Sequence, residues 1–116
     1  AAEGISATVI NARFVKPLDE ELLLDLARTH RGVVTIEENT CMGGFGSAVL
    51  ELYNRERVDT PVRVAAIPDK VFEQASQNRL RELAGIGIDS VVTIGREVAQ
   101  TASRSLHAVE ISTVAD

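Results

Sequence analysis

The sequence predicts an α/β domain whose mostly parallel sheet is covered by helices. Short β-branched runs alternate with amphipathic segments along the chain, as they do where crossover helices join parallel strands. Hydrophobic residues make up 45% of the chain and aromatic residues only 3%, so the core must be aliphatic. Such a core is typical of parallel strands that are buried on both faces.

Composition excludes several classes of protein. The 116 residues correspond to a single domain. The formal net charge of -5 and the lack of a basic stripe argue against nucleic-acid binding. Cys41 is the only cysteine, so no internal disulfide can form, and a reducing, cytoplasmic setting is expected. No apolar run approaches the roughly 20 residues of a membrane helix, and we expect neither a membrane contact nor a signal peptide.

The first half of the chain predicts a strand, a helix, a second strand and a second helix. The β-branched run at residues 5–12 is typical of a buried strand. Asp19 is placed to cap the next helix and Gly32 to end it. Residues 32–38 form the second strand, which is apolar until its acidic tip. The helix that follows carries apolar residues on one face from Phe45 onward.

The second half predicts one more strand and two helices. Prolines bracket a strand at residues 62–67, and Ser76 and Gly85 mark the ends of a short helix. Residues 91–94 have the composition of a strand, but Asp89 is a good N-cap and the apolar spacing continues at helical period. We therefore predict a helix there, followed from about residue 110 by a frayed tail.

An acidic strand tip and a glycine cluster lie close together in the sequence. They form a candidate interface or anion-binding corner of six residues: Glu37, Glu38, Asn39, Gly43, Gly44 and Gly46. Backbone amides at a helix N-terminus can hold an anion, and α/β domains place ligands at strand ends. However, Val49 stands where the third glycine of a dinucleotide fingerprint belongs. We therefore favour close helix–sheet packing over phosphate binding, with a positive φ or a close contact at Gly44 or Gly46.

The titratable residues form no complete catalytic set. Glu37 and Glu38 are adjacent, so in a strand they point to opposite faces and cannot act as a facing acid–base pair. Contact with solvent or with a partner subunit is the favoured interpretation for both. His30 and His107 have no positioned partner, and Cys41 has no evident base. We expect no catalytic, cofactor-binding or metal-binding residue in this chain.

Three strings carry a resemblance to a known family. NARFVKPLDEELL, VVTIEEN and MGGFGSAVLELY resemble the C-terminal domain of 1-deoxy-D-xylulose-5-phosphate synthase, in the transketolase-like thiamine-diphosphate family. The resemblance extends over about residues 7–99, and the tail beyond residue 100 falls outside it. It implies a three-layer α/β/α sandwich on a five-stranded mixed sheet, with a first strand and helix upstream of Ala1. We expect a transketolase C-terminal-like domain at residues 1–100 and an extension at residues 101–116.

The resemblance also implies a function for the parent enzyme. Members condense pyruvate with glyceraldehyde 3-phosphate, release carbon dioxide, and feed isoprenoid, thiamine and pyridoxal synthesis. Thiamine diphosphate and magnesium are held by two earlier domains, the expected partners of this chain in a homodimer, so the chain alone should be inactive. Gln74 and Ala75 replace a His-Gly pair of many members. The alternatives are the matching domain of a 2-oxo acid dehydrogenase beta subunit or transketolase, and a non-enzymatic anion-binding regulatory module.

Overall fold

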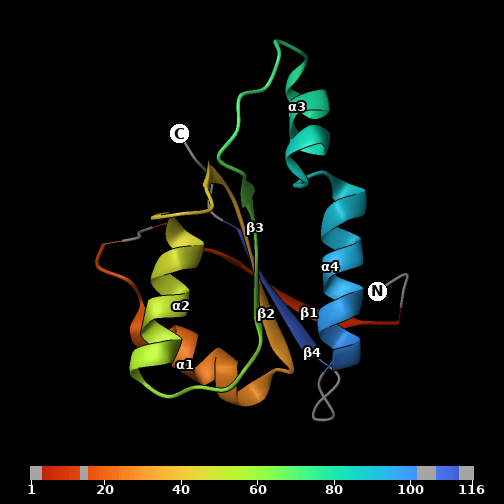
Figure 1. Cartoon of the computed structure of the whole chain (residues 1–116). Coiled ribbons are helices and arrows are strands. Elements are labelled where there is room, and N and C mark those ends of the chain that lie inside the picture. The colour runs from red at the N-terminus through yellow and green to blue at the C-terminus, as the bar shows by residue number, and fades with distance from the viewer. Residues whose placement is uncertain (1–3, 14–15, 102–106, 113–116) are drawn as a thin grey trace.

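The computed structural model describes residues 4–13, 16–101 and 107–112 (Figure 1). Strands and helices alternate along the chain as predicted, and the segment after Gly87 is a helix. In chain order the elements are β1 (Ser6–Asn11), α1 (Glu20–Thr29), β2 (Gly32–Thr40), α2 (Phe45–Arg55), β3 (Val62–Ile67), α3 (Gln77–Ala84), α4 (Ile88–Thr101) and β4 (His107–Ser112).

The four strands form one sheet in the order β1-β4-β2-β3, and every neighbouring pair is parallel. Helices α1 and α2 lie on one side of this sheet and α4 lies on the other (Figure 1). The predicted three-layer α/β/α sandwich is therefore confirmed. In the described residues the sheet has four strands, all parallel. The five-stranded mixed sheet that the resemblance implied for the whole domain stays a prediction.

Strand β4 contradicts the expectation of a frayed tail from about residue 110. Residues Glu110 to Ser112 belong to this strand, which lies between β1 and β2 and pairs with both. The pairing is non-local, so no short-range signal in the sequence marks it: β4 is fixed by the two open strand edges that it joins. The proposed domain boundary at residue 100 stays a prediction.

Two helix boundaries also differ from expectation. Gly32 begins β2 as predicted, but it does not end α1, which stops at Thr29 with His30 as its C-cap. A Cβ atom on Gly32 would collide with the side chain of Val98 on α4. Asp89 lies inside the first turn of α4 and not at its N-cap, because the helix already begins at Ile88. By contrast, Asp19 caps α1 and Ser76 caps α3 as predicted.

The core lies between the sheet and the pair α1 and α2. Its buried members are aliphatic apart from two aromatic residues of α2: Leu23, Leu26, Ala27, Val33, Phe45, Val49, Leu52 and Tyr53. The hydroxyl of Tyr53 donates a hydrogen bond of 2.7 Å to the carbonyl oxygen of Leu23. This bond satisfies the polar end of a buried ring and fixes α2 against α1.

Alkaline pH should destabilise the fold through Tyr53. Burial raises the pKa of its phenol from 10.0 to about 12. The folded chain thus favours the neutral phenol, and this stabilisation is complete below pH 10 and is lost as the pH rises to about 12. We expect the free energy of unfolding to fall by up to about 3 kcal/mol across this window.

The measurement is simple because Tyr53 is the only tyrosine and the chain has no tryptophan. Tyrosinate absorbance should rise near pH 12 in the folded chain and near pH 10 in concentrated urea. The Tyr53→Phe variant should lose the pH-dependent change in stability. Equal midpoints with and without urea would contradict the burial of this ring.

Candidate functional site

The β2–α2 corner, residues 37–46, is held together by the carboxylate of Glu37. This side chain is only 1% exposed. Its Oε1 accepts a hydrogen bond of 2.9 Å from the N–H of Phe45, and its Oε2 accepts one of 2.6 Å from the N–H of Gly46. Both amides lie in the first turn of α2, where no carbonyl of the helix can reach them. Glu37 therefore fills the position that an external anion would take at this helix N-terminus.

The expectation that Glu37 faces solvent or a partner is wrong. Alternation along β2 places Glu37 on the same face as Val33, which packs against α1 and α2. The negative charge is tolerated there because two amides at the positive end of α2 bind it. The sequence showed that the two acids point to opposite faces, but it did not show which face meets a helix end.

The glycines of the corner allow α2 to approach the sheet closely. A Cβ atom on Gly46 would lie 2.6 and 2.7 Å from the two methyl carbons of Val64 and 2.8 Å from Oγ1 of Thr35. A Cβ atom on Gly44 would collide with the Glu37 carboxylate and lie 2.9 Å from the carbonyl oxygen of Thr40. The predicted close contact is confirmed at both glycines, whereas the positive φ, +80°, belongs to Gly43.

Gly46→Ala should therefore destabilise the fold. We expect the free energy of unfolding to drop by more than about 1 kcal/mol, because the added methyl group overlaps β2 and β3. Gly95→Ala is the matched control, since Gly95 lies inside α4 with open space around it. There the same change should stabilise the helix by up to about 1 kcal/mol. An unchanged or higher melting temperature for Gly46→Ala would show that packing does not require this glycine.

The loop between β2 and α2 is tied by its own hydrogen bonds. The N–H of Gly43 donates to Oγ of Ser47 at 3.0 Å, and this hydroxyl donates to the carbonyl oxygen of Cys41, also at 3.0 Å. Cys41 is exposed and carries a free thiol, and its N–H donates to the carbonyl oxygen of Ile67 on β3. Asn39 is exposed at the end of β2. These contacts give the loop a defined shape without using a ligand.

Glu38 points to the other face and joins β2 to α3. Its Oε1 accepts a hydrogen bond of 2.6 Å from Nε of Arg81 and forms an ion pair with Nη2 of the same side chain at 2.5 Å. The two side chains are 38% and 40% exposed. Sequence reasoning missed Arg81, because it lies 43 positions away and nothing local links it to Glu38.

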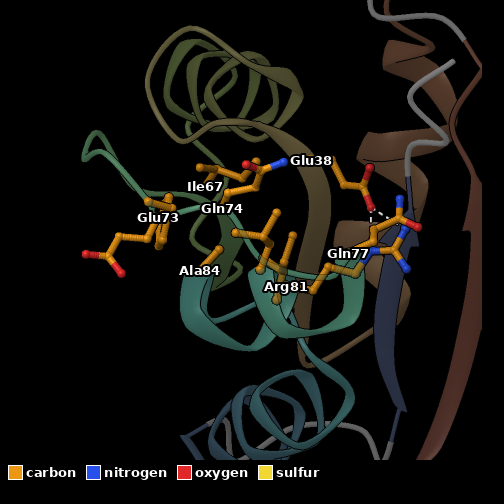
Figure 2. A pocket seen from close by; sticks show the side chains of 10 residues that line it. Glu38, Ile67, Glu73, Gln74, Gln77, Arg81 and Ala84 are labelled. Carbon is orange, nitrogen blue, oxygen red and sulfur yellow. Dashed lines mark hydrogen bonds and ion pairs between the residues drawn. The ribbon is translucent and has the colours of Figure 1, made fainter.

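A pocket of about 330 Å³ lies beside this ion pair, between the end of β3, the loop after it and α3 (Figure 2). Ten residues line it: Glu38, Ile67, Phe72, Glu73, Gln74, Gln77, Leu80, Arg81, Ala84 and Ile86. Gln74, which we expected to replace a histidine of many members of the resembling family, is among them. No pattern in the sequence predicts this pocket, because Glu38 and Ile67 lie on two strands far along the chain from some of the other lining residues.

His30 has a structural place between α1 and β1. Its Nε2 lies 3.0 Å from Oγ1 of Thr8, and its Nδ1 lies 2.8 Å from Oγ1 of Thr29. Neither acid of the corner is among these partners. The side chain of His107 lies outside the described residues.

The β2–α2 corner does not fit the diphosphate of thiamine diphosphate. The amides of Phe45 and Gly46 already bind Glu37, whose charge would repel a diphosphate. Within residues 4–13, 16–101 and 107–112, no three His, Cys, Asp or Glu side chains are grouped so that they could hold a metal ion. Likewise, no helix in this part of the chain is long and apolar enough to cross a membrane.

The fold and the β2–α2 corner together define the class of protein. It is an α/β/α domain with a parallel sheet, in which the carboxylate of Glu37 binds the amides at the glycine-rich N-terminus of α2. The family model described as "Transketolase, C-terminal domain" matches residues 1–91. The chain belongs to this family.

Two of the curated relatives to which the chain is similar are 1-deoxy-D-xylulose-5-phosphate synthases. The chain is 46% identical over 111 residues to 1-deoxy-D-xylulose-5-phosphate synthase of Heliobacterium modesticaldum. This match covers 96% of the chain and 17% of the relative. It is 48% identical over 116 residues to 1-deoxy-D-xylulose-5-phosphate synthase 1 of Geobacter sulfurreducens, covering 98% of this chain and 18% of the relative. The chain thus spans less than a fifth of their length. Both matches reach into β4, so the expectation that the tail beyond residue 100 falls outside the similarity is wrong.

A solved structure shares the fold. It is titled "Split gene transketolase, inactive beta4 tetramer" and superposes with a TM-score of 0.78 at 38% sequence identity. The match covers 89% of this chain and 33% of that one.

Proposed function

We propose that this chain is the C-terminal domain of a 1-deoxy-D-xylulose-5-phosphate synthase. The observation that carries the proposal is the identity of 46% and 48% to synthases over 96% and 98% of the chain. The parent enzyme would be a cytoplasmic homodimer that condenses pyruvate with glyceraldehyde 3-phosphate and releases carbon dioxide. Its product would serve isoprenoid, thiamine and pyridoxal synthesis.

Within that enzyme the chain would act in assembly and not in catalysis. The closed β2–α2 corner supports this role, because its amides and its buried carboxylate satisfy each other and leave nothing for a substrate phosphate. Thiamine diphosphate and magnesium would be held by the remaining domains of the parent enzyme. The same internal carboxylate disfavours the anion-binding regulatory module.

A graft tests the proposal. The chain replaces the matching C-terminal 17% of the Heliobacterium modesticaldum synthase, and product formation from pyruvate and glyceraldehyde 3-phosphate is measured. We expect a soluble chimera with synthase activity. A second chimera that carries Glu37→Ala controls for the fold of the grafted domain and should lose stability together with activity. A folded, stable first chimera without activity would contradict the assignment.

The isolated chain should be inactive. Supplied with thiamine diphosphate, magnesium, pyruvate and glyceraldehyde 3-phosphate, the purified 116-residue chain should release no carbon dioxide above a blank. The physical reason is that the amides at the α2 N-terminus are already bound to Glu37. Carbon dioxide release above the blank would overturn the proposed division of labour between domains.

A split-gene transketolase subunit is the second candidate, supported by the 38% identity to a solved structure of that kind. The same graft into that subunit separates the two candidates, and because its tetramer is titled inactive, the readout there is assembly and not activity. We expect the chain to replace the native domain better in the synthase background, because the sequence identity to the synthases is higher.

A further inference from the structure

The pocket beside α3 lies at the ends of β2 and β3, two neighbouring strands whose following helices, α2 and α4, cover opposite sides of the sheet (Figure 1). Strand β2 is followed by α2 on one side of the sheet, whereas the neighbouring parallel strand β3 is followed by α3 and α4, and α4 lies on the other side (Figure 1). Open parallel sheets bind ligands in the crevice outside the carboxyl ends of their strands at such a switch point. Glu38 near the end of β2 and Ile67 at the end of β3 both line the pocket.

The walls of the pocket are mainly apolar. Ile67, Phe72, Leu80, Ala84 and Ile86 supply them, and the volume of about 330 Å³ is within the range of small-molecule sites. No residue of α3 is buried, although its Leu80 and Ala84 line this space. A ligand here would remove that apolar surface from water and so bind with a hydrophobic contribution.

One end of the pocket is polar but carries no net charge. Figure 2 shows Glu38, Arg81 and Gln77 together at this end, with the carboxylate of Glu73 directed away from them. Arg81 donates a hydrogen bond from Nε to Oε1 of Glu38, and its Nη2 forms an ion pair with the same oxygen. In the part of the chain that the structure describes, Oε2 of Glu38 and Nη1 of Arg81 have no hydrogen-bond partner. The pair thus presents an acceptor and a donor close together.

We propose that this pocket binds a small neutral molecule with an apolar ring or branched chain and a carboxamide-like group. The ligand N–H donates to Oε2 of Glu38, and the ligand carbonyl accepts from Nη1 of Arg81. The apolar body lies against Leu80 and Ala84. An anion is disfavoured because Glu38 already neutralises Arg81, which separates this site from any site for a sugar phosphate. The site does not depend on the activity of the parent enzyme.

Three probes of equal shape test the ligand class: benzamide, benzoate and benzamidinium, with inorganic phosphate as a fourth. Each is titrated into the isotopically labelled 116-residue chain, and backbone amide shifts are followed by NMR. We expect benzamide to shift the amides of α3, most at Arg81 and Ala84, and to bind more tightly than either charged probe. Tighter binding of benzoate or phosphate, or no shift in α3 with any probe, would overturn the proposal.

Variants locate the site and test its charge balance. Ala84→Phe fills the pocket and should weaken benzamide binding at least about tenfold. Leu83→Phe is the control: it adds the same ring to an α3 residue that does not line the pocket, and it should leave benzamide binding unchanged. Glu38→Gln leaves Arg81 uncompensated and should reverse the preference toward benzoate, and Arg81→Met should reverse it toward benzamidinium. Benzamide binding that survives Ala84→Phe, or a probe preference unchanged in Glu38→Gln, would show that the ion pair and the pocket do not form this site.

Discussion

Replacing Glu37 with glutamine should lower the free energy of unfolding by about 2–4 kcal/mol. The carboxylate accepts from two backbone amides in a place that is 1% exposed. A glutamine side chain keeps one oxygen but turns an NH₂ group toward the other amide, which leaves two donors facing each other. Glu37→Ala should cost at least as much, because it removes both acceptors and opens a cavity behind α2.

Glu38→Gln is the matched control for this change. The substitution is the same and the position is adjacent, but Glu38 is 38% exposed and its ion pair with Arg81 is open to water. Its loss should cost no more than about 1 kcal/mol. Chemical denaturation of both variants gives the comparison. Equal effects at the two positions would contradict the internal closure of the corner.

Strand β4 should be the most sensitive element of the sheet. It lies between β1 and β2, and at Val109 its backbone is paired with Thr8 on one side and with Val33 on the other. Val109→Pro removes a ladder donor in the middle of the sheet and should cost roughly 3 kcal/mol or more. Because β1 reaches the rest of the sheet through β4, its amides should lose protection against hydrogen exchange.

Val109→Ala serves as the control, since alanine keeps the backbone N–H that proline lacks. We expect the alanine variant to retain protection of the β1 amides. If the proline variant kept the same denaturation midpoint and the same protected amides as the alanine variant, β4 would not be a central strand in solution.

Local signals were sufficient for most of the fold. Asp19 and Ser76 offer side-chain acceptors to helix amides, and prolines flank β3, so these boundaries depend on neighbours in the sequence. β4 could not be predicted in this way, because its pairing depends on two strands far along the chain. The pairing of Glu38 with Arg81 is non-local for the same reason.

The candidate site shows the limit of motif reasoning. An acidic strand tip followed by glycines predicts either a ligand-binding corner or a packed turn, and the sequence favoured packing. The deciding feature is the direction of one side chain: Glu37 points at the α2 N-terminus and takes the place of a ligand. That direction follows from which face of β2 the helix covers, a property of the tertiary structure.

The central claim is that Glu37 closes the β2–α2 corner from inside. NMR can test it through scalar couplings across hydrogen bonds, from the amide nitrogens of Phe45 and Gly46 to the side-chain carboxyl carbon of Glu37. We predict measurable couplings at both amides and no change in their shifts when inorganic phosphate is added. Absent couplings, with amide shifts that move on phosphate addition, would show that the corner is open and binds anions.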